Sequence, residues 1–281
     1  MHESLAAWAL FCGQRIWRNW THLADSVRSG SSATRRSGGQ DDFAHLDADP
    51  PAADLFHRAM TNLTRPVAAA FAASIDLEGE LRVVDVGGGY GQLLVALLLA
   101  HPRLRGVLFD LPHAIEPAVA QIARLGLIAR CELVSGSFFD SLPAGGDVYL
   151  LKSVLHDWDD AHCVRILQHC RQAMAGRPGA RLFVIERLAP EHFAATPRDR
   201  AIARSDLNMP ILRSLLNRSG PVRTQRRRDV DWSLDGRGGH GREHFRRQSW
   251  TDPIERLSDR RWDEPGQRRI HVSIARRRRR P

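Results

Sequence analysis

The segment Val83-Val84-Asp85-Val86-Gly87-Gly88-Gly89-Tyr90-Gly91 joins a run of β-branched residues to a cluster of glycines. β-Branched residues favour a strand, and glycine allows the positive φ angles that a tight turn requires. The apolar segment 92–100 follows directly and predicts a short helix. Because the backbone of such a strand, turn and helix can approach a ligand closely, the segment predicts a nucleotide-binding unit around which the fold is built.

The spacing of the glycines distinguishes between two kinds of cofactor site. A dinucleotide-binding fingerprint has the pattern Gly-x-Gly-x-x-Gly, and its last position is occupied here by Gln92. The pattern that fits is Asp-x-Gly-x-Gly-x-Gly, with Asp85 followed by Gly87, Gly89 and Gly91. This pattern resembles the first motif of methyltransferases that use S-adenosylmethionine. The resemblance implies that these four residues bind this cofactor.

Strand-like and helix-like segments alternate from residue 81 onwards. The sequence predicts strands at 81–86, 106–109, 131–134, 148–151 and 182–185, with helices at 92–100, 113–123 and 160–174 between them. Such alternation predicts an α/β fold with a parallel sheet and right-handed crossovers. Ligands of such sheets bind at the carboxyl ends of the strands, so we expect the functional residues there.

Two other regions flank this α/β pattern, which we assign to residues 76–212. Residues 1–75 have helical periodicity at 5–28, 43–46, 52–60 and 61–75, with Asp49-Pro50-Pro51 as a predicted break and no catalytic motif. Residues 213–281 are rich in arginine and have little periodicity, apart from a strand-like segment at 271–275. We therefore expect a helical region on the acceptor or dimer side, a cofactor-binding domain, and an anomalous, disordered tail.

The basic charge of the chain belongs to its last segment. The formal net charge is +9, with 41 basic and 32 acidic residues, but residues 213–281 contain 20 of the basic and 9 of the acidic ones. Residues 1–212 are therefore slightly acidic. This distribution argues against a nucleic-acid-binding surface on the folded part of the chain.

Several classes of protein are disfavoured by the sequence. The four cysteines show no metal-ligand spacing, and the carboxylates and histidines do not cluster, so we expect no metal and reduced thiols. The most apolar run, 92–100, is far shorter than a membrane span, and the N-terminus lacks a signal-peptide pattern. We expect a cytoplasmic protein without membrane contact.

An acidic residue ends the second predicted strand, 19 residues after Gly91. Asp110 follows the apolar run 106–109, and an ionised carboxylate there can accept hydrogen bonds from both hydroxyls of a ribose. The alternative role of Asp110 is to cap the helix predicted from residue 113. The methyltransferase-like motif upstream favours the ribose role.

Two further stretches narrow the resemblance to one family. Phe109-Asp110-Leu111-Pro112-His113 and Tyr149-Leu150-Leu151-Lys152-Ser153-Val154-Leu155-His156-Asp157-Trp158-Asp159-Asp160 resemble motifs of plant and bacterial small-molecule O-methyltransferases. That family includes caffeic acid, hydroxyindole, hydroxyneurosporene and polyketide-tailoring enzymes. The resemblance implies a Rossmann-like class I methyltransferase fold. It also implies transfer of a methyl group from S-adenosylmethionine to a hydroxyl of a small aromatic or polyketide-like molecule.

The resemblance implies a catalytic pair as well. His156 matches the family's general base, since a neutral imidazole can remove the proton of a phenol or enol as it attacks the methyl group. Glu186 matches a glutamate that orients this histidine. Each residue has a structural alternative. His156 could be the polar end of a strand that enters a helix, and Glu186 an ordinary charge at a strand end.

Five more positions match cofactor contacts of the family. Thr64 matches a hydroxyl that contacts the carboxylate of S-adenosylmethionine, and Lys152 matches a lysine that reaches the nucleoside. Leu111 would contact the cofactor, and Phe138 would pack against its adenine. Ser137 stands where several relatives have an aspartate that receives the adenine amine, so this contact is expected to be weaker.

The chain departs from the family pattern near both ends. Relatives have a winged-helix dimerisation domain ahead of the helices seen here, so the homodimer typical of the family is not expected for this chain. The nearest match to their Gly-Gly-x-Glu-Arg-Thr motif is Ser219-Gly220-Pro221-Val222-Arg223-Thr224, with Val222 at the acidic position. We hypothesise that residues 213–270 are read out of frame in a GC-rich gene and that 271–275 return to frame. The alternative is a genuine basic tail.

Two other functions stay open from the sequence. Val222 and the missing segments suit an inactive or repurposed relative that binds S-adenosylmethionine without transferring a methyl group. The basic tail suits a nucleic-acid methyltransferase, although the chain lacks an Asn/Asp-Pro-Pro-Tyr type of base-flipping motif. The acceptor itself is not specified by the sequence, because scattered residues shape its pocket.

Overall fold

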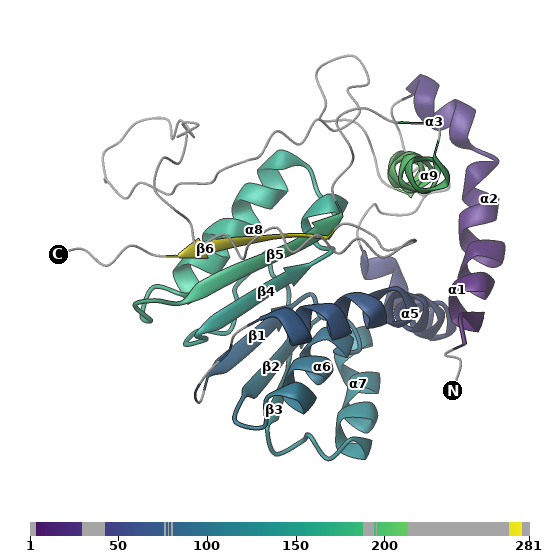
Figure 1. Cartoon of the computed structure of the whole chain (residues 1–281). Helices are drawn as coiled ribbons and strands as arrows, with labels where there is room; N and C mark the ends of the chain where they lie inside the picture. The colour runs from purple at the N-terminus through teal and green to yellow at the C-terminus, as the bar shows by residue number, and fades with distance from the viewer. Residues whose placement is uncertain are drawn as a thin grey trace, which may run out of the picture.

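The computed structural model describes residues 4–29, 43–75, 77, 79, 81–187, 194, 196–212 and 270–276. Its centre is a sheet in the order β3-β2-β1-β4-β5-β6 (Figure 1). The strands are β1 (Arg82–Val86), β2 (Arg105–Asp110), β3 (Cys131–Ser135), β4 (Val148–Lys152), β5 (Arg181–Arg187) and β6 (Ile270–Arg276). Strands β1 to β5 run parallel, whereas β6 is antiparallel to β5. The predicted parallel α/β fold and its five strands are confirmed.

Helices cover both faces of this sheet (Figure 1). On one face lie α5 (Pro50–Ser74), α6 (Gln92–Ala100) and α7 (Pro112–Arg124), and on the other lies α8 (Asp160–Ala173). A hydrophobic core lies on each face of the sheet, and alternate residues of β1 pack in one or the other. Val83 packs in the core that contains α6, and Val84 packs in the core that contains α8. Both faces of the sheet are therefore apolar, as parallel strands require, and polar functional groups are left to the strand ends.

Helix α5 is longer than the sequence predicts. Separate helices were expected at 52–60 and 61–75 after a break at 49–51, but a single helix runs from Pro50 to Ser74. Asp49 is its N-cap and accepts a hydrogen bond from a backbone N–H of the first turn at 3.1 Å. Pro50 and Pro51 lie in the first turn of α5, where the backbone N–H groups have no partner within the helix. Prolines are therefore tolerated there and begin the helix. No glycine or proline follows residue 60 directly, so nothing ends the helix there.

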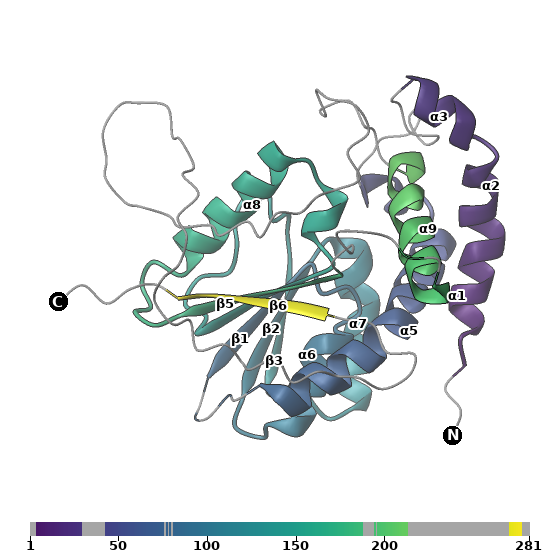
Figure 2. The same ribbon diagram turned by 45° about the horizontal axis from the view of Figure 1, so that its top comes forward.

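The N-terminal helical elements are α1 (Ala6–Phe11), a π-helical turn (Cys12–Ile16), α2 (Trp17–Trp20), α3 (Leu23–Ser29) and a 3-10 turn (Phe43–Leu46). Of these, α1 and the 3-10 turn contact α5 (Figure 2). The Trp8 N–H donates to the Asn62 side chain at 3.3 Å, which joins α1 to α5. The segment 5–28, which has helical periodicity, is thus divided into several short helical elements. Helix α9 (Pro197–Leu212) contacts α2 and α3 and was not predicted, because its hydrophobic periodicity is weak.

The arginine-rich tail is described only at its strand. Residues 213–269, which include most of the hypothesised out-of-frame segment, the predicted disordered tail and the 219–224 motif, lie outside the described residues. The strand predicted at 271–275 is confirmed as β6. Within the described ranges, no helix combines the length and apolar character of a membrane span, and no group of three or more histidines, cysteines and carboxylates is placed to hold a metal ion.

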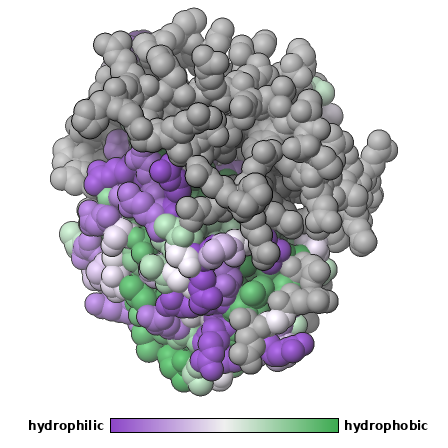
Figure 3. All heavy atoms as spheres, turned by 90° about the vertical axis from the view of Figure 1, so that its left-hand side faces the viewer, coloured by the Kyte–Doolittle hydropathy of each residue, from purple (hydrophilic) through white to green (hydrophobic). Residues whose placement is uncertain are grey.

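The two edges of the sheet differ in chemistry. At the edge where the strands begin, which faces the viewer in Figure 3, hydrophilic and hydrophobic residues are interspersed. Arg82 pairs there with Glu132 at 2.7 Å, and Arg177 pairs with Asp147 at 3.6 Å. Such exposed pairs contribute little to stability. The opposite edge, where the strands end, carries the glycine loop.

Gly88 permits the glycine loop to lie directly on the sheet. A Cβ atom at this position would lie 2.5 Å from Leu108 Cδ1 and 2.8 Å from the carboxyl group of Asp85. Gly88→Ala is therefore expected to lower the free energy of unfolding by about 1–3 kcal/mol, which a thermal melt would detect. Gly176→Ala is the control, because nothing lies within 4 Å of its Cβ position. Equal melting temperatures for the two variants would contradict this close packing.

Candidate active site

The residues predicted from separate motifs meet at one edge of the sheet. In the register of the strands, Val86 of β1 pairs with Phe109 of β2 and with Leu151 of β4. Lys152 of β4 pairs with Ile185 of β5. The segments that follow these strands therefore start side by side in the order β2, β1, β4, β5, and each carries a predicted functional group.

The glycine loop adopts a conformation that glycine makes possible. Gly87, Gly89 and Gly91 have φ angles of 68°, 57° and 77°, in the left-handed region. The Gly87 N–H donates to the Phe109 carbonyl at 2.8 Å, and Gly91 is the N-cap of α6. The loop thus crosses the end of β2 before it enters the helix. Because glycine has no side chain, a ligand can approach the backbone of the loop closely at its glycines.

Asp110 is held at the end of β2 by the loop itself. Its Oδ2 accepts a hydrogen bond from the Gly89 N–H, and its Oδ1 accepts one from the Leu111 N–H, both at 2.7 Å. Burial raises the pKa of Asp110, and these two hydrogen bonds oppose the rise. The N-cap of α7 is Leu111, without a side-chain hydrogen bond, so Asp110 does not cap that helix. Each carboxylate oxygen keeps a lone pair that can accept from a ribose hydroxyl.

Asp85 lies beneath the glycine loop. Only 1% of this residue is exposed, and its Oδ2 has no hydrogen-bond partner among the residues that the structure describes. Burial and the nearby Asp110 raise the pKa of Asp85 to about 7. A positive charge close by stabilises the ionised form of a buried carboxyl group, so Asp85 suits a cationic ligand on the loop above it.

Lys152 and Thr64 connect the end of β4 to α5. The Lys152 Nζ donates a hydrogen bond to the Thr64 Oγ1 at 2.9 Å, and this hydroxyl donates to the Met60 carbonyl at 2.8 Å. The two residues are 88 positions apart in the sequence. The fold thus brings together two of the predicted cofactor contacts and places a positive charge beside a hydroxyl.

His156 and Glu186 form a hydrogen-bonded pair at the ends of β4 and β5. His156 Nδ1 lies 2.7 Å from Glu186 Oε2, and the backbone N–H of His156 donates to Glu186 Oε1 at 3.3 Å. Glu186 is 5% exposed, whereas the His156 side chain is 34% exposed. Burial lowers the pKa of His156, but the carboxylates of Asp157 and Glu186 outweigh this effect, so the pKa is raised above its ordinary value.

The backbone turns sharply at Ser153, just before His156. Ser153 has a φ angle of 55°, which residues other than glycine rarely adopt. Its N–H donates to the Ile185 carbonyl at 3.0 Å, which holds the turn against β5. Such a conformation persists only where its surroundings enforce it. We infer that this turn directs the chain so that the imidazole meets Glu186.

Phe138 lies beside the glycine loop. Its Cε1 atom is 3.6 Å from the Cβ position of Gly87. The centroid of its ring lies 4.8 Å from that of Phe139 and 5.8 Å from that of Trp158. This aromatic wall is compatible with the predicted place of Phe138 in an adenine slot, because flat rings pack well against one another.

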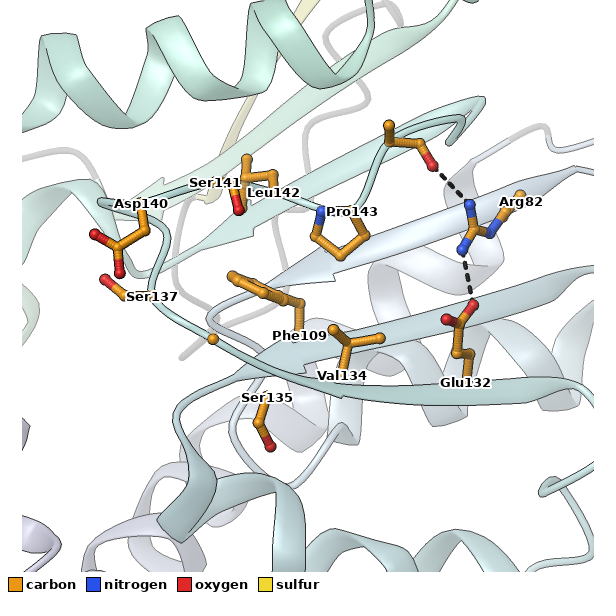
Figure 4. Close-up of a pocket in the computed structure, with 12 residues that line it drawn as sticks. Arg82, Phe109, Glu132, Val134, Ser135, Ser137, Asp140, Ser141, Leu142 and Pro143 are labelled. Atoms are coloured by element: carbon orange, nitrogen blue, oxygen red, sulfur yellow. Dashed lines mark hydrogen bonds and ion pairs between the residues drawn. The ribbon is translucent and has the colours of Figure 1, made fainter.

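Ser137 lines a separate hollow of about 580 Å³ between β3 and the loop that follows it (Figure 4). Its Oγ accepts a hydrogen bond from the Phe139 N–H at 3.1 Å, so the hydroxyl is engaged within its own loop. Figure 4 shows Arg82 at the other end of the hollow, bound to Glu132 and to a loop carbonyl. An ion pair, serines and apolar groups line this hollow, and none of the predicted catalytic residues does. We therefore assign the candidate active site to the carboxyl ends of the strands.

A cluster of polar side chains around the buried His57 joins α5 to the glycine loop and was not predicted. His57 is 4% exposed and stacks on Tyr90, with ring centroids 4.8 Å apart. The Tyr90 hydroxyl donates to Asp54 at 3.1 Å, and the His113 ring lies 5.1 Å from that of His57. Burial and His113 lower the pKa of His57 to about 3, so its imidazole is neutral near pH 7. No short motif marks these residues, because the packing of α5 brings them together.

The sequence is similar to those of known O-methyltransferases. A model of the O-methyltransferase domain family matches residues 20–229. The mitomycin biosynthesis 6-O-methyltransferase of Streptomyces lavendulae is 43% identical over 180 residues, which cover 64% of this chain and 51% of that protein. The phenazine O-methyltransferase PhzM of Lysobacter antibioticus is 37% identical over 189 residues, which cover 67% of this chain and 55% of that protein. The chain thus spans about half the length of these curated relatives.

Solved structures share the architecture. The mitomycin 7-O-methyltransferase MmcR superposes with a TM-score of 0.67 and 39% identity, over 75% of this chain and 61% of that one. The O-methyltransferase NcsB1 from neocarzinostatin biosynthesis, in complex with S-adenosylmethionine and 2-hydroxy-5-methyl naphthoic acid, superposes with a TM-score of 0.62 and 36% identity. That match covers 71% of this chain and 57% of NcsB1. These likenesses confirm the predicted Rossmann-like methyltransferase fold.

Proposed function

This chain belongs to the O-methyltransferase domain family, and on that premise we propose that it transfers a methyl group from S-adenosylmethionine to a hydroxyl of a small aromatic molecule. The observation that carries the proposal is the pairing of His156 with Glu186 at the same sheet edge as the glycine loop and Asp110. A base and a cofactor site that share one edge can hold the reacting groups close together, which is the main requirement of a direct displacement.

The groups of the proposed cofactor site match the chemistry of S-adenosylmethionine. The Asp110 carboxylate can accept hydrogen bonds from its ribose hydroxyls, the Thr64 hydroxyl suits its carboxylate, and the Lys152 ammonium suits a polar group of its nucleoside. The Oδ2 atom of Asp85, which has no hydrogen-bond partner among the described residues, suits a ligand with cationic sulfonium and ammonium groups. When bound, the cofactor supplies an electrophilic methyl group. The chain's own residues bind it, orient it and limit its contact with water.

His156 is arranged as a general base. Ionised Glu186 can only accept hydrogen bonds, so we assign the imidazole proton to Nδ1, which leaves the Nε2 lone pair for the proton of an acceptor hydroxyl. The Asp157 carboxylate lies 3.6 Å from Nε2 and, with Glu186, favours the protonated imidazole. His156 thus accepts the hydroxyl proton at Nε2 while Glu186 fixes the orientation of the ring.

The aromatic side chains around Trp158, which follows His156 closely in the sequence, support an aromatic acceptor. The Trp158 ring, two residues after His156, lies 4.6 Å from that of Phe139 and 6.3 Å from that of Phe43. Such rings favour flat partners, which they bind by offset or edge-to-face contacts. A hydroxylated naphthoic acid occupies the complex of the related NcsB1. We therefore propose a phenol-type hydroxyl as the methyl acceptor.

Glu186→Gln tests the orienting role of Glu186. The amide keeps the shape of the side chain but loses the charge that helps to raise the pKa of His156. Transfer needs neutral imidazole, so the rate falls as the pH drops through this pKa, and the falling limb is expected to move to lower pH in the variant. Loss of a charged hydrogen bond is also expected to lower the plateau rate by roughly 10- to 100-fold. The measurement is the pH dependence of kcat/KM.

Glu132→Gln is the matched control, because Glu132 pairs with Arg82 at the far edge of the sheet. This variant is expected to keep both the plateau rate and the pH profile of the wild type. An unshifted pH profile in Glu186→Gln would contradict the orienting role. Wild-type protein that binds no S-adenosylmethionine would contradict the proposed function itself.

A further inference from the structure

His57 carries a polar atom that the described part of the chain leaves without a partner. Its Nε2 is buried and has no hydrogen-bond partner among the described residues. The other ring nitrogen, Nδ1, lies 3.4 Å from the Cβ position of Gly89, so the imidazole rests against the glycine loop. Because buried polar atoms are nearly always hydrogen-bonded in proteins, this unpartnered nitrogen, in a ring that contacts the glycine loop, indicates a ligand group.

The position of His57 on α5 places it over the cofactor site. His57 and Thr64 are seven residues apart, which is two helical turns, so they lie on the same face of the helix. At one end of this face, Thr64 accepts the hydrogen bond from Lys152. At the other end, His57 meets Gly89, whose N–H donates to Asp110. His57 therefore lies next to the loop that holds the proposed ribose-binding carboxylate.

The His57 ring is already fixed in orientation. It stacks on Tyr90 with 26° between the ring planes, and the rings of Phe56 and His113 lie 5.2 Å and 5.1 Å from it. Tyr90 is held in turn by its hydrogen bond to Asp54. The imidazole is neutral, so one nitrogen is a donor and the other an acceptor, and it does not repel a cationic cofactor. A fixed and neutral imidazole is suited to bind a hydroxyl group.

We propose that His57 is a further residue of the cofactor site and that its Nε2 forms a hydrogen bond with a ribose hydroxyl of S-adenosylmethionine beside Asp110. The inference rests on the proposed function, because it assigns His57 to the same site. Asp110 accepts the protons of the ribose hydroxyls, and each hydroxyl oxygen keeps lone pairs for a donor on another side. His57 supplies that donor from α5, so the ribose is held both by the sheet and by the helix that covers it.

The test compares two ligands that differ only in the ribose. The probes are S-adenosylhomocysteine and its 2′,3′-dideoxy analogue, and their affinities are measured by calorimetry. His57→Phe keeps a ring that can stack on Tyr90 but has no polar atom. This variant is expected to bind S-adenosylhomocysteine about five- to tenfold more weakly and to bind the dideoxy analogue as the wild type does. His57→Gln, which restores a donor, is expected to recover part of the loss.

His101→Phe is the matched control, because His101 also contacts α5, through the Ala72 carbonyl at 3.4 Å, but does so far from the glycine loop. It is expected to bind both ligands like the wild type. Equal weakening of both ligands in His57→Phe would overturn the inference, since the imidazole would then act through packing alone. Unchanged affinity for both would overturn it as well. Wild-type protein that binds neither ligand would instead contradict the proposed function.

Discussion

His156→Ala is expected to lower the rate of methyl transfer by about 10²- to 10⁴-fold and to leave the affinity for S-adenosylmethionine almost unchanged. Removal of a positioned base has effects of this size, because the acceptor hydroxyl then has to lose its proton to water. His156 is paired with Glu186, whereas the proposed ribose site consists of Asp110 and the glycine loop. The measurements are single-turnover transfer to a phenol and calorimetric titration with the cofactor.

A second variant, His156→Gln, distinguishes loss of the base from loss of the folded structure. Truncation to alanine removes the hydrogen bond between the imidazole and the buried Glu186, which is destabilising in itself. Glutamine can donate to Glu186 but cannot take up a proton near pH 7, so we expect the same loss of rate with a melting temperature closer to that of the wild type. Transfer at the wild-type rate in both variants would contradict the role of His156 as a base.

Asp110→Asn is expected to weaken the binding of S-adenosylmethionine by about 100-fold. The amide has one acceptor oxygen, so it cannot serve the N–H groups of Gly89 and Leu111 and two ribose hydroxyls at once. Two lost hydrogen bonds to a charged group, at about 1.5 kcal/mol each, correspond to roughly this factor. The dissociation constant from calorimetry is the measurement.

Asp140→Asn is the control for this variant. Asp140 is an exposed aspartate that lines the hollow beyond β3, and its substitution is expected to leave the affinity unchanged (Figure 4). Melting curves of both variants are needed, because Asp110 also holds the glycine loop in place. A folded Asp110→Asn protein with wild-type affinity would contradict the ribose role of the carboxylate.

The position at strand ends of several residues of the candidate site could be predicted from the sequence. Asp110 and Glu186 each follow an apolar run, and the carboxyl ends of parallel strands share one edge of the sheet. The glycine pattern at 85–91 likewise reflects a local requirement, since three of its residues have positive φ angles. Such features depend on residues that are close in the sequence, so they can be predicted from local sequence patterns.

Features that depend on tertiary packing could not be predicted in this way. The contact of His57 with Gly89 exists because α5 lies across the loop, and the sequence of the helix does not state where it docks. The left-handed turn at Ser153 is imposed by its bond to β5 and carries no glycine to mark it. The continuity of α5 past residue 60 was also missed, although no glycine or proline follows residue 60 directly to end the helix there.

The central claim is that this chain, with the sequence it has, transfers the methyl group of S-adenosylmethionine to a hydroxyl. The most direct measurement is mass spectrometry after incubation of the purified chain with methyl-labelled cofactor and a panel of hydroxylated aromatic acids that includes 2-hydroxy-5-methyl naphthoic acid. We expect a labelled O-methyl product that is absent with His156→Ala. Cofactor binding without a labelled product from any member of the panel would contradict the claim and would favour a relative that binds the cofactor without transferring its methyl group.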